Sequence, residues 1–318
     1  MTQSIVPLEV AGFTHPGQVR ELNEDTWAKE SLPNGELFLV ADGMGGHRTG
    51  EVASSMATES LVAAMRELAD VPTQSLPRAM QRSNLAVFQH ASRKAESRGM
   101  GTTMTAVVVD GNAAIVGHVG DSRAYLIRGS RIEQLTRDHS WVAERVRQGL
   151  LSEEEARDHK WRNVITNALG SRPQLRLDLF GMNLLEGDII LICSDGLSNL
   201  VTEQQMLRVA LERVYDPIES VTAELVELAN TAGGHDNITC VVARVKRLMP
   251  RSKPYPLPQL PKDEGYSPDL QVDPTSTMIY EGNTVQASQR RWLLPLAIVL
   301  YVVLFGALLL LLGRPGVK

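Results

Sequence analysis

Residues 105–135 read TAVVVDGNAAIVGHVGDSRAYLIRGSRIEQL, and the connections within this stretch predict the kind of sheet that the chain forms. Short runs rich in Val, Ile, Ala and Leu are typical of β-strands. We expect these strands at residues 105–109, 113–119, 124–127 and 132–135. A parallel crossover needs about a dozen residues or more, and the connections here are far shorter. The stretch therefore predicts an antiparallel meander and excludes a Rossmann-type parallel sheet.

The segments around this stretch combine further strands with helices. Mainly apolar runs predict buried strands at 37–41, 189–193 and 239–245. Apolar residues at helical spacing predict helices at 51–68, 76–96, 203–214 and 218–232. A polar helical section is expected at 140–158, and a loop or short helix at 163–170. Strands accompanied by helix pairs indicate a layered α+β sandwich.

Composition narrows the class of protein. The chain has 318 residues, of which 43% are hydrophobic and 22% charged, as in a globular protein. The net charge of −5, with no basic block in the folded part, argues against nucleic acid as a partner. Cys193 and Cys240 both lie in apolar strand-like runs. We interpret them as reduced core residues, since two such thiols make neither a disulfide framework nor a zinc site.

The end of the chain differs from the rest. From Met249 onward, prolines interrupt a polar stretch with little periodicity. Residues 292–312, WLLPLAIVLYVVLFGALLLLL, carry no charge and are long enough to cross a bilayer as a helix. The alternative, a buried core helix, would need a polar stripe and a domain around it. We expect a folded domain over residues 1–247, a Pro-rich disordered linker over 248–289, and a transmembrane anchor with a short tail over 290–318.

The N-terminus lacks a basic region followed by an apolar one, so no signal peptide is evident. Together with reduced cysteines, this favours a single-pass tail anchor in the inner (cytoplasmic) membrane, with the main domain in the cytoplasm. The charges that flank the apolar run do not decide its orientation.

Four aspartates lie at the ends of predicted strands. Asp42, Asp121 and Asp195 follow apolar runs, and Asp236 precedes one. Carboxylates at close range repel one another, so a shared cluster persists only if cations neutralise it. Oxygen ligands without a His/Cys cluster indicate Mg²⁺ or Mn²⁺ rather than zinc. The glycine-rich turn after Asp42 is not a P-loop, because no Gly-Lys-Ser/Thr follows.

Six motifs in order give a more specific indication. They are RELNED at 20–25, DGMGGH at 42–47, GTT at 101–103, GHVGDSR at 117–123, SDGL at 194–197 and DNIT at 236–239. In this order the chain resembles the bacterial type 2C metal-dependent serine/threonine protein phosphatases, the PPM family. The resemblance covers about residues 10–245, and TNALG at 166–170 matches a further short segment. It implies two packed antiparallel β-sheets flanked by helix pairs, a four-layer αββα sandwich.

The resemblance also implies roles at a first metal ion. Asp42 would bridge two ions, and the Gly43 carbonyl would be a further ligand. Asp195 and Asp236 would complete the ligands of the first ion. The cofactor is accordingly expected to be Mn²⁺ or Mg²⁺, as two ions and a weaker third.

Further roles follow from the same resemblance. Glu24 and Asp25 would hold waters around the second ion, and Asp121 would form the third site together with Asp195. Arg20 would bind the substrate phosphate, because its planar guanidinium matches two phosphate oxygens. Arg20 and Asp42 are thus the expected catalytic residues.

The implied reaction is hydrolysis of phosphoserine and phosphothreonine in proteins by a water that two metal ions activate. The expected partners are phosphorylated proteins and a bacterial Ser/Thr kinase that the enzyme opposes. Met44 stands where many eukaryotic members have a histidine that is a proposed general acid, and the match assigns no such role to His47. The proton donor therefore stays open. The resemblance also places a variable flap beside the active site, in the polar segment bracketed by His139 and Trp161.

Two other functions compete with this one. A catalytically inactive phosphoprotein-binding regulator could have the same fold, but intact Asp42, Asp195 and Asp236 argue against it. A two-metal phosphodiesterase or nuclease is disfavoured by the acidic balance and by the lack of an aromatic–basic groove.

Overall fold

The computed structural model describes residues 7–45 and 49–259. The chain divides into two units, residues 1–279 and 280–318, and all described residues lie in the first. One antiparallel sheet has the strand order β1 (Leu8–His15), β11 (Ile238–Val245), β10 (Ile189–Cys193), β7 (Arg123–Arg128) and β8 (Arg131–Gln134). The other has the order β2 (Asp25–Leu32), β3 (Gly35–Met44), β5 (Met104–Asp110), β6 (Ala113–Val119) and β9 (Asp178–Asn183). A short strand, β4 (Gly101–Thr102), pairs with the end of β3.

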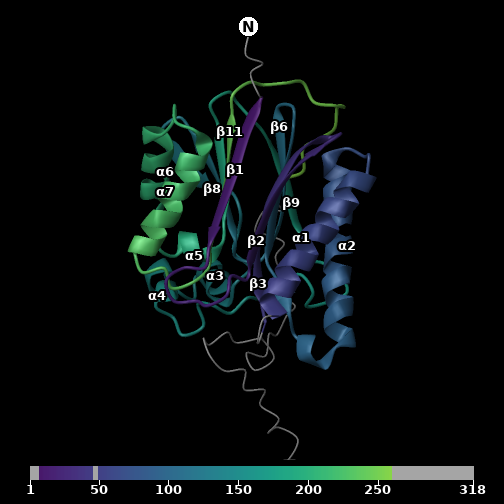
Figure 1. Ribbon diagram of the computed structural model, residues 1–318, viewed down its shortest axis with the longest axis vertical. Helices are drawn as coiled ribbons and strands as arrows, with labels where there is room; N and C mark the ends of the chain where they lie inside the picture. Colours follow the sequence, from purple (N-terminus) through teal and green to yellow (C-terminus); the bar gives the residue numbers. More distant parts are fainter. Residues whose placement is uncertain (1–6, 46–48, 260–318) are drawn as a thin grey trace, which may run out of the picture. The chain divides into compact units, whose positions relative to one another are not determined.

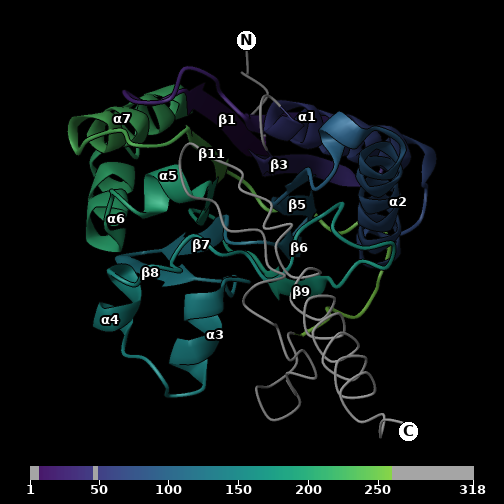
Figure 2. The ribbon, with the colours of Figure 1, turned by 90° about the horizontal axis from the view of Figure 1, so that it is seen from below.

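Two helix pairs cover the outer faces of these sheets (Figures 1 and 2). Helices α1 (Thr49–Glu67) and α2 (Pro72–Arg93) pack on the sheet that contains β3. Helices α6 (Glu203–Glu212) and α7 (Ile218–Thr231) pack on the sheet that contains β11. The remaining helices are η1 (Ala95–Ser97), α3 (Trp141–Arg147), α4 (Glu153–Arg157) and α5 (Asp195–Ser198). The expected four-layer sandwich of two antiparallel sheets is confirmed.

Hydrophobic clusters fill the interfaces between the layers. In β3, Leu37, Leu39 and Ala41 belong to the cluster under α1 and α2, while Phe38 and Val40 belong to the cluster between the sheets. The same alternation in β10 divides its side chains between α6/α7 and the opposite sheet. Because both faces are buried, these strands are continuous apolar runs and were recognisable in the sequence.

The prediction of a single meander is wrong at residues 120–122. β5 and β6 form one antiparallel hairpin and β7 and β8 another, but β6 and β7 belong to different sheets. The short connection passes between two sheets that lie face to face. Gly120 makes this possible with a φ of +109°, a conformation that favours glycine. Asp121 consequently lies where the chain crosses from one sheet to the other.

The sequence prediction missed the two-residue strand β4 and three longer strands, β1, β2 and β9, which all lie at sheet edges. An edge strand has one neighbour and mixed burial, so its apolar pattern is weak. In β1, for example, Leu8 is buried whereas Phe13 is 42% exposed. The predicted helical section at 140–158 consists of two short helices, α3 and α4.

Residues 249–258, hereafter the C-terminal strap, lie on the domain although they were expected to begin the linker. Ser252 donates to both carboxylate oxygens of Asp110, from its backbone N–H (2.8 Å) and its Oγ (2.9 Å). Tyr255 is buried in the cluster under α1 and α2. Gly181 of β9 donates its N–H to the Pro258 carbonyl at 2.8 Å. Packing thus continues beyond the predicted boundary at residue 247, because Tyr255 has apolar surface to bury.

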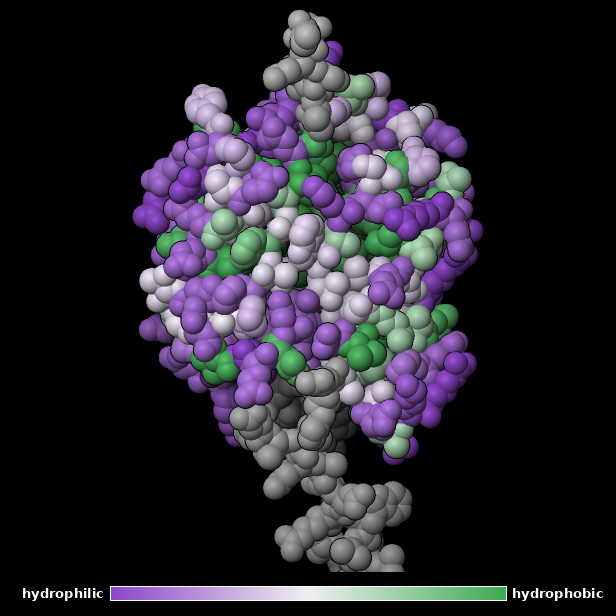
Figure 3. All heavy atoms as spheres, in the orientation of Figure 1, coloured by the Kyte–Doolittle hydropathy of each residue, from purple (hydrophilic) through white to green (hydrophobic). Residues whose placement is uncertain are grey.

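Among the described residues, none of the helices combines the length and the hydrophobicity that crossing a membrane requires. The predicted span at 292–312 and most of the predicted linker lie outside the described residues. On the face of the domain shown in Figure 3, hydrophobic residues form small separate groups among hydrophilic ones.

Candidate functional site

The predicted aspartates meet at one end of the two sheets. Asp25 begins β2 and pairs in register with Asp42 near the end of β3. Asp195 begins α5 directly after β10, and Asp236 lies two residues before β11. Ser194 connects the sheets here by donating its Oγ hydrogen to Asp25 Oδ2 at 2.8 Å. The common end of both sheets therefore carries the carboxylates.

Two threonines fix the backbone around Asp42. The Asp42 N–H donates to Thr103 Oγ1 at 3.0 Å. The Asp42 carbonyl accepts from the Thr103 N–H at 2.9 Å and from Thr102 Oγ1 at 2.8 Å. The backbone beyond it is packed closely, since a Cβ on Gly43 would lie 2.1 Å from the Gly50 carbonyl oxygen. Glycine is required there because no side chain fits.

Asp25 is the most deeply buried of these carboxylates, with 7% of its surface exposed. Its Oδ1 atom is buried and has no hydrogen-bond partner. Burial raises the pKa of Asp25 to about 7, with added repulsion from nearby carboxylates, although the hydrogen bond from Ser194 opposes the shift. Burying the charged carboxylate of Asp25 destabilises the fold, and a nearby cation would reduce this destabilisation.

The same two causes act on the other aspartates. Burial, and then repulsion from Asp25 and its neighbours, raises the pKa of Asp42 well above its ordinary value. Burial and the charge of Asp195 do the same to the pKa of Asp121. Burial and the charge of Asp236 raise the pKa of Asp195 to about 6, although a hydrogen bond with Asp42 opposes the shift. These shifts show that the carboxylates share one electrostatic site.

Arg20 lies at the exposed side of this cluster. Its Nη2 atom donates to Asp236 Oδ2 at 2.9 Å, and both side chains are partly exposed. Burial acts against its charge, but Asp236, Glu24 and Asp42 together raise the pKa of Arg20. Glu24 faces the same arginine, and burial raises the pKa of Glu24.

Asn237 holds the segment that carries Arg20 and Glu24. Its Oδ1 accepts from the Glu24 N–H at 2.8 Å, and its Nδ2 donates to the carbonyls of Pro16 (3.0 Å) and Leu22 (2.8 Å). One amide side chain thus fixes the polar loop beside the start of β11. The prediction did not assign a role to Asn237 or to Ser194, although both lie within the quoted DNIT and SDGL motifs.

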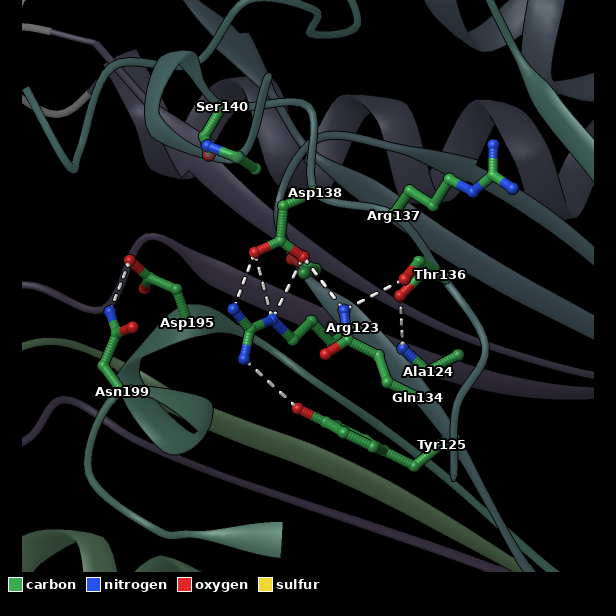
Figure 4. Close-up of polar contacts among 12 residues, drawn as sticks. Arg123, Ala124, Tyr125, Gln134, Thr136, Arg137, Asp138, Ser140, Asp195 and Asn199 are labelled. Atoms are coloured by element: carbon green, nitrogen blue, oxygen red, sulfur yellow. Dashed lines mark hydrogen bonds and ion pairs between the residues drawn. The ribbon is translucent and has the colours of Figure 1, made fainter. Parts of the chain in front are cut away.

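A pair of charged residues borders the cluster near Asp195 (Figure 4). Arg123 binds Asp138 through both Nε and Nη2, with the shortest distance 2.7 Å from Nη2 to Oδ2. Asp195 accepts from Asn199 Nδ2 at 3.2 Å across one turn of α5. Both contacts are made by one edge of the Arg123 guanidinium, which therefore forms its ion pair with Asp138.

The residues fit a divalent cation by their chemistry. No three His, Cys, Asp or Glu side chains of residues 7–45 and 49–259 are arranged, as they stand, to hold a metal ion. The donors that do converge are carboxylate oxygens, which Mg²⁺ and Mn²⁺ prefer. One of them, Asp25 Oδ1, is buried without a partner, and positive charge would relieve the raised pKa values.

Comparison with known proteins identifies the class of this site. The sequence profile of the family described as protein phosphatase 2C matches residues 15–231, more than half of the chain. The chain belongs to this family, and it is a metal-dependent protein serine/threonine phosphatase.

Named relatives agree with the family. The serine/threonine phosphatase stp of Listeria welshimeri is 35% identical over 249 residues, which cover 76% of this chain and 96% of that protein. The crystal structure of the Mycobacterium tuberculosis serine/threonine phosphatase PstP/Ppp is similar with a TM-score of 0.68 and 34% identity, covering 76% of this chain and 99% of that one. A structure of the PstP catalytic domain in complex with two manganese ions has a TM-score of 0.67 and 34% identity, covering 75% of this chain and 98% of that one.

Proposed function

We propose that this phosphatase removes phosphate from phosphoserine and phosphothreonine of cytoplasmic proteins while tethered to the membrane, and that it opposes a bacterial Ser/Thr kinase. The observation that supports the reaction is the group of mutually repelling carboxylates beside a partly exposed arginine. A phosphate group is an anion and would be repelled by the carboxylates alone, so its binding requires cations at the same place.

Arg20 is proposed to hold the substrate phosphate. Its guanidinium can donate two parallel hydrogen bonds to phosphate oxygens, and its partner Asp236 is only partly buried. When the substrate phosphate replaces Asp236 as the partner of Arg20, the arginine stays paired with a negatively charged group. Held in this way, the phosphate is oriented over the carboxylate cluster, and the charge that develops on its oxygens during transfer is stabilised.

The carboxylates are proposed to hold the metal ions. Asp42, the Gly43 carbonyl, Asp195 and Asp236 would hold the first ion, with Asp42 shared between two. Divalent cations bound there would supply Lewis acidity that generates a nucleophile from water near neutral pH.

The outer positions have their own proposed roles. Glu24 and Asp25 would hold waters around the second ion, and Asp121 would form a weaker third site with Asp195. The buried position of Asp25, held by Ser194, suits a group that orients a neighbour rather than one that meets substrate. Met44 is buried at the end of β3 and has no proton to give, so the proton for the leaving alkoxide comes from another group.

The membrane anchor and the kinase are proposed on other grounds. Residues 292–312 form an uncharged run of sufficient length for a membrane helix, and this sequence property alone supports the tether. The tether would confine the enzyme to phosphoproteins near the membrane. A kinase that forms Ser/Thr phosphoesters is the class of enzyme whose products this reaction consumes.

The decisive test is hydrolysis of a phosphothreonine peptide by the full chain in detergent. We expect activity with Mn²⁺, loss of activity with a chelator, and recovery when Mn²⁺ is restored. A matched Arg20→Lys variant keeps the charge but loses the two-pronged geometry, and should raise KM for the peptide. No hydrolysis with Mn²⁺ bound, as measured by calorimetry, would refute the proposed reaction.

A further inference from the structure

His139 is a buried residue beside the carboxylate cluster to which the proposed mechanism gives no role. Only 3% of its surface is exposed. It lies between β8 and α3, far in the sequence from the residues that it contacts. Its ring lies against that of His118, with the centroids 4.9 Å apart. Its polar contacts explain why a histidine is buried here.

His139 binds both backbone groups of Gly120. The His139 N–H donates to the Gly120 carbonyl at 2.7 Å, and the Gly120 N–H donates to His139 Nδ1 at 3.1 Å. A backbone N–H can only donate, so Nδ1 must accept and carries no proton. The ring proton is therefore on Nε2, which lies 3.3 Å from Asp178 Oδ2 and donates to it. The tautomer is fixed by these two contacts.

Gly120 is the residue at which the chain crosses between the sheets, directly before Asp121. Thr103 limits it on the other side, since a Cβ at Gly120 would lie 2.5 Å from the Thr103 side chain. Thr103 also contacts Ser122 through their hydroxyl groups (2.7 Å) and accepts from the Asp42 N–H. The turn that presents Asp121 is thus held between Thr103 and His139.

His139 also contacts the segment that follows the two short helices. Its carbonyl accepts from the Thr166 N–H at 2.8 Å. Asn167 Nδ2 lies 3.1 Å from His139 Nδ1, and it donates to the Arg176 carbonyl at 2.9 Å. A continuous set of hydrogen bonds therefore runs from residues 166–176 through His139 to Gly120.

We propose that His139 is a positioning residue, which holds the Gly120 peptide so that Asp121 is presented to the carboxylate cluster, and which connects this turn to residues 166–176. The inference rests on the proposed role of Asp121 in metal binding. In this proposal His139 contacts neither substrate nor metal. Its effect passes through the Gly120 N–H, and loss of a group that orients a metal ligand weakens metal binding by about 10- to 100-fold.

Two substitutions separate the contacts of His139. In His139→Asn, the side-chain oxygen can take the place of Nδ1 and accept from the Gly120 N–H, but nothing reaches Asp178. In His139→Gln, the side-chain amide can take the place of Nε2 and donate to Asp178, but the Gly120 N–H loses its acceptor. Both variants replace the ring by a neutral amide, so they share the loss of ring packing.

The measurement is Mn²⁺ binding by the full chain in detergent, by calorimetry, together with the Mn²⁺ dependence of phosphopeptide hydrolysis. The quantity compared is the Kd of the most weakly bound Mn²⁺ ion. We expect this Kd in His139→Asn to stay within about threefold of that of the unaltered protein, and in His139→Gln to rise at least about tenfold. Thermal unfolding in chelator should be lowered similarly in both variants. The control is His118→Gln, because the native His118 ring is hydrogen-bonded to Thr105 and to the Arg137 carbonyl. This variant should lower thermal stability without the tenfold weakening of Mn²⁺ binding.

The proposal is overturned if the two variants of His139 bind Mn²⁺ equally, or if the order is reversed, because the Gly120 contact then has no separate effect. An equal effect of His118→Gln would also overturn it in favour of general packing. Unchanged Mn²⁺ binding by Asp121→Asn would remove the premise of the proposal, which is the role of Asp121 in metal binding. If the unaltered protein binds Mn²⁺ but hydrolyses no phosphopeptide, the proposed reaction alone is refuted.

Discussion

Replacing Asp25 by Asn should stabilise the metal-free protein. Asp25 is 7% exposed, its Oδ1 has no partner, and burial raises its pKa from 3.8 to about 7. A carboxylate whose pKa is raised by folding contributes full stability while it is protonated, below pH 4. That contribution is lost as the pH rises toward and through 7, because the folded state must then hold the charge.

The magnitude follows from the same shift. A pKa rise from 3.8 to about 7 corresponds to an upper limit of about 4 kcal/mol at pH 8, at about 1.4 kcal/mol for each pH unit. Asn cannot ionise, and its carbonyl can still accept from Ser194 Oγ, which donates to Asp25 Oδ2 in the native protein. The variant should therefore keep the hydrogen bond with Ser194 and should not lose stability as the pH rises. At pH 5 the expected difference falls to less than half.

Urea unfolding in chelator at pH 5 and pH 8, with residues 1–259, measures both values. The control is Asp188→Asn, because Asp188 is also buried but accepts two hydrogen bonds from Arg128 at 2.9 and 2.7 Å. The control should be less stable than the unaltered protein at pH 8, the opposite sign. If Asp25→Asn is destabilised at pH 8, or if its advantage does not grow from pH 5 to pH 8, the electrostatic account of the site is refuted.

Three further outcomes are expected. Asp42→Asn should lower Mn²⁺-dependent kcat by at least about 10³-fold in a phosphopeptide assay while circular dichroism stays unchanged; near-normal turnover would contradict the site assignment. The free energy of unfolding of residues 1–247 should be about 2–5 kcal/mol lower than that of residues 1–259, because the space that Tyr255 fills is emptied. Equal urea midpoints would show that the C-terminal strap adds no stability. Deleting residues 292–318 should move the protein from the membrane to the soluble fraction in sedimentation, and continued membrane partition would rule out the anchor.

The parts of the fold that the sequence predicted are those whose burial produces a strong pattern. β3 and β10 are buried on both faces, so each is a continuous apolar run that identifies a central strand. The edge strands β1, β2 and β9 have mixed burial and were missed. The crossing at Gly120 was also missed, because a short connection does not reveal whether the next strand pairs with the last one or begins the opposite sheet.

The site shows the same division. Asp42, Asp121, Asp195 and Asp236 stand next to strands, so their convergence was predictable from strand ends. Ser194 and Asn237, which hold that cluster in place, are polar residues of a common kind whose partners are distant in the sequence. Their roles depend on how the two sheets face each other, and a single sequence does not contain that information in any local pattern.

The C-terminal strap determines where a pulling force on the rest of the chain would enter the domain. Without it, tension would act directly on the end of β11, a strand that lies between β1 and β10. With it, the first contact to bear the load is the hydrogen bond between Gly181 and Pro258, at the edge strand β9. Contacts back to Ser252 must then open one after another before β11 is loaded. Under such a force the hydrogen bonds of the C-terminal strap at Pro258 and Ser252 would be loaded before β11, the strand that follows Asp236.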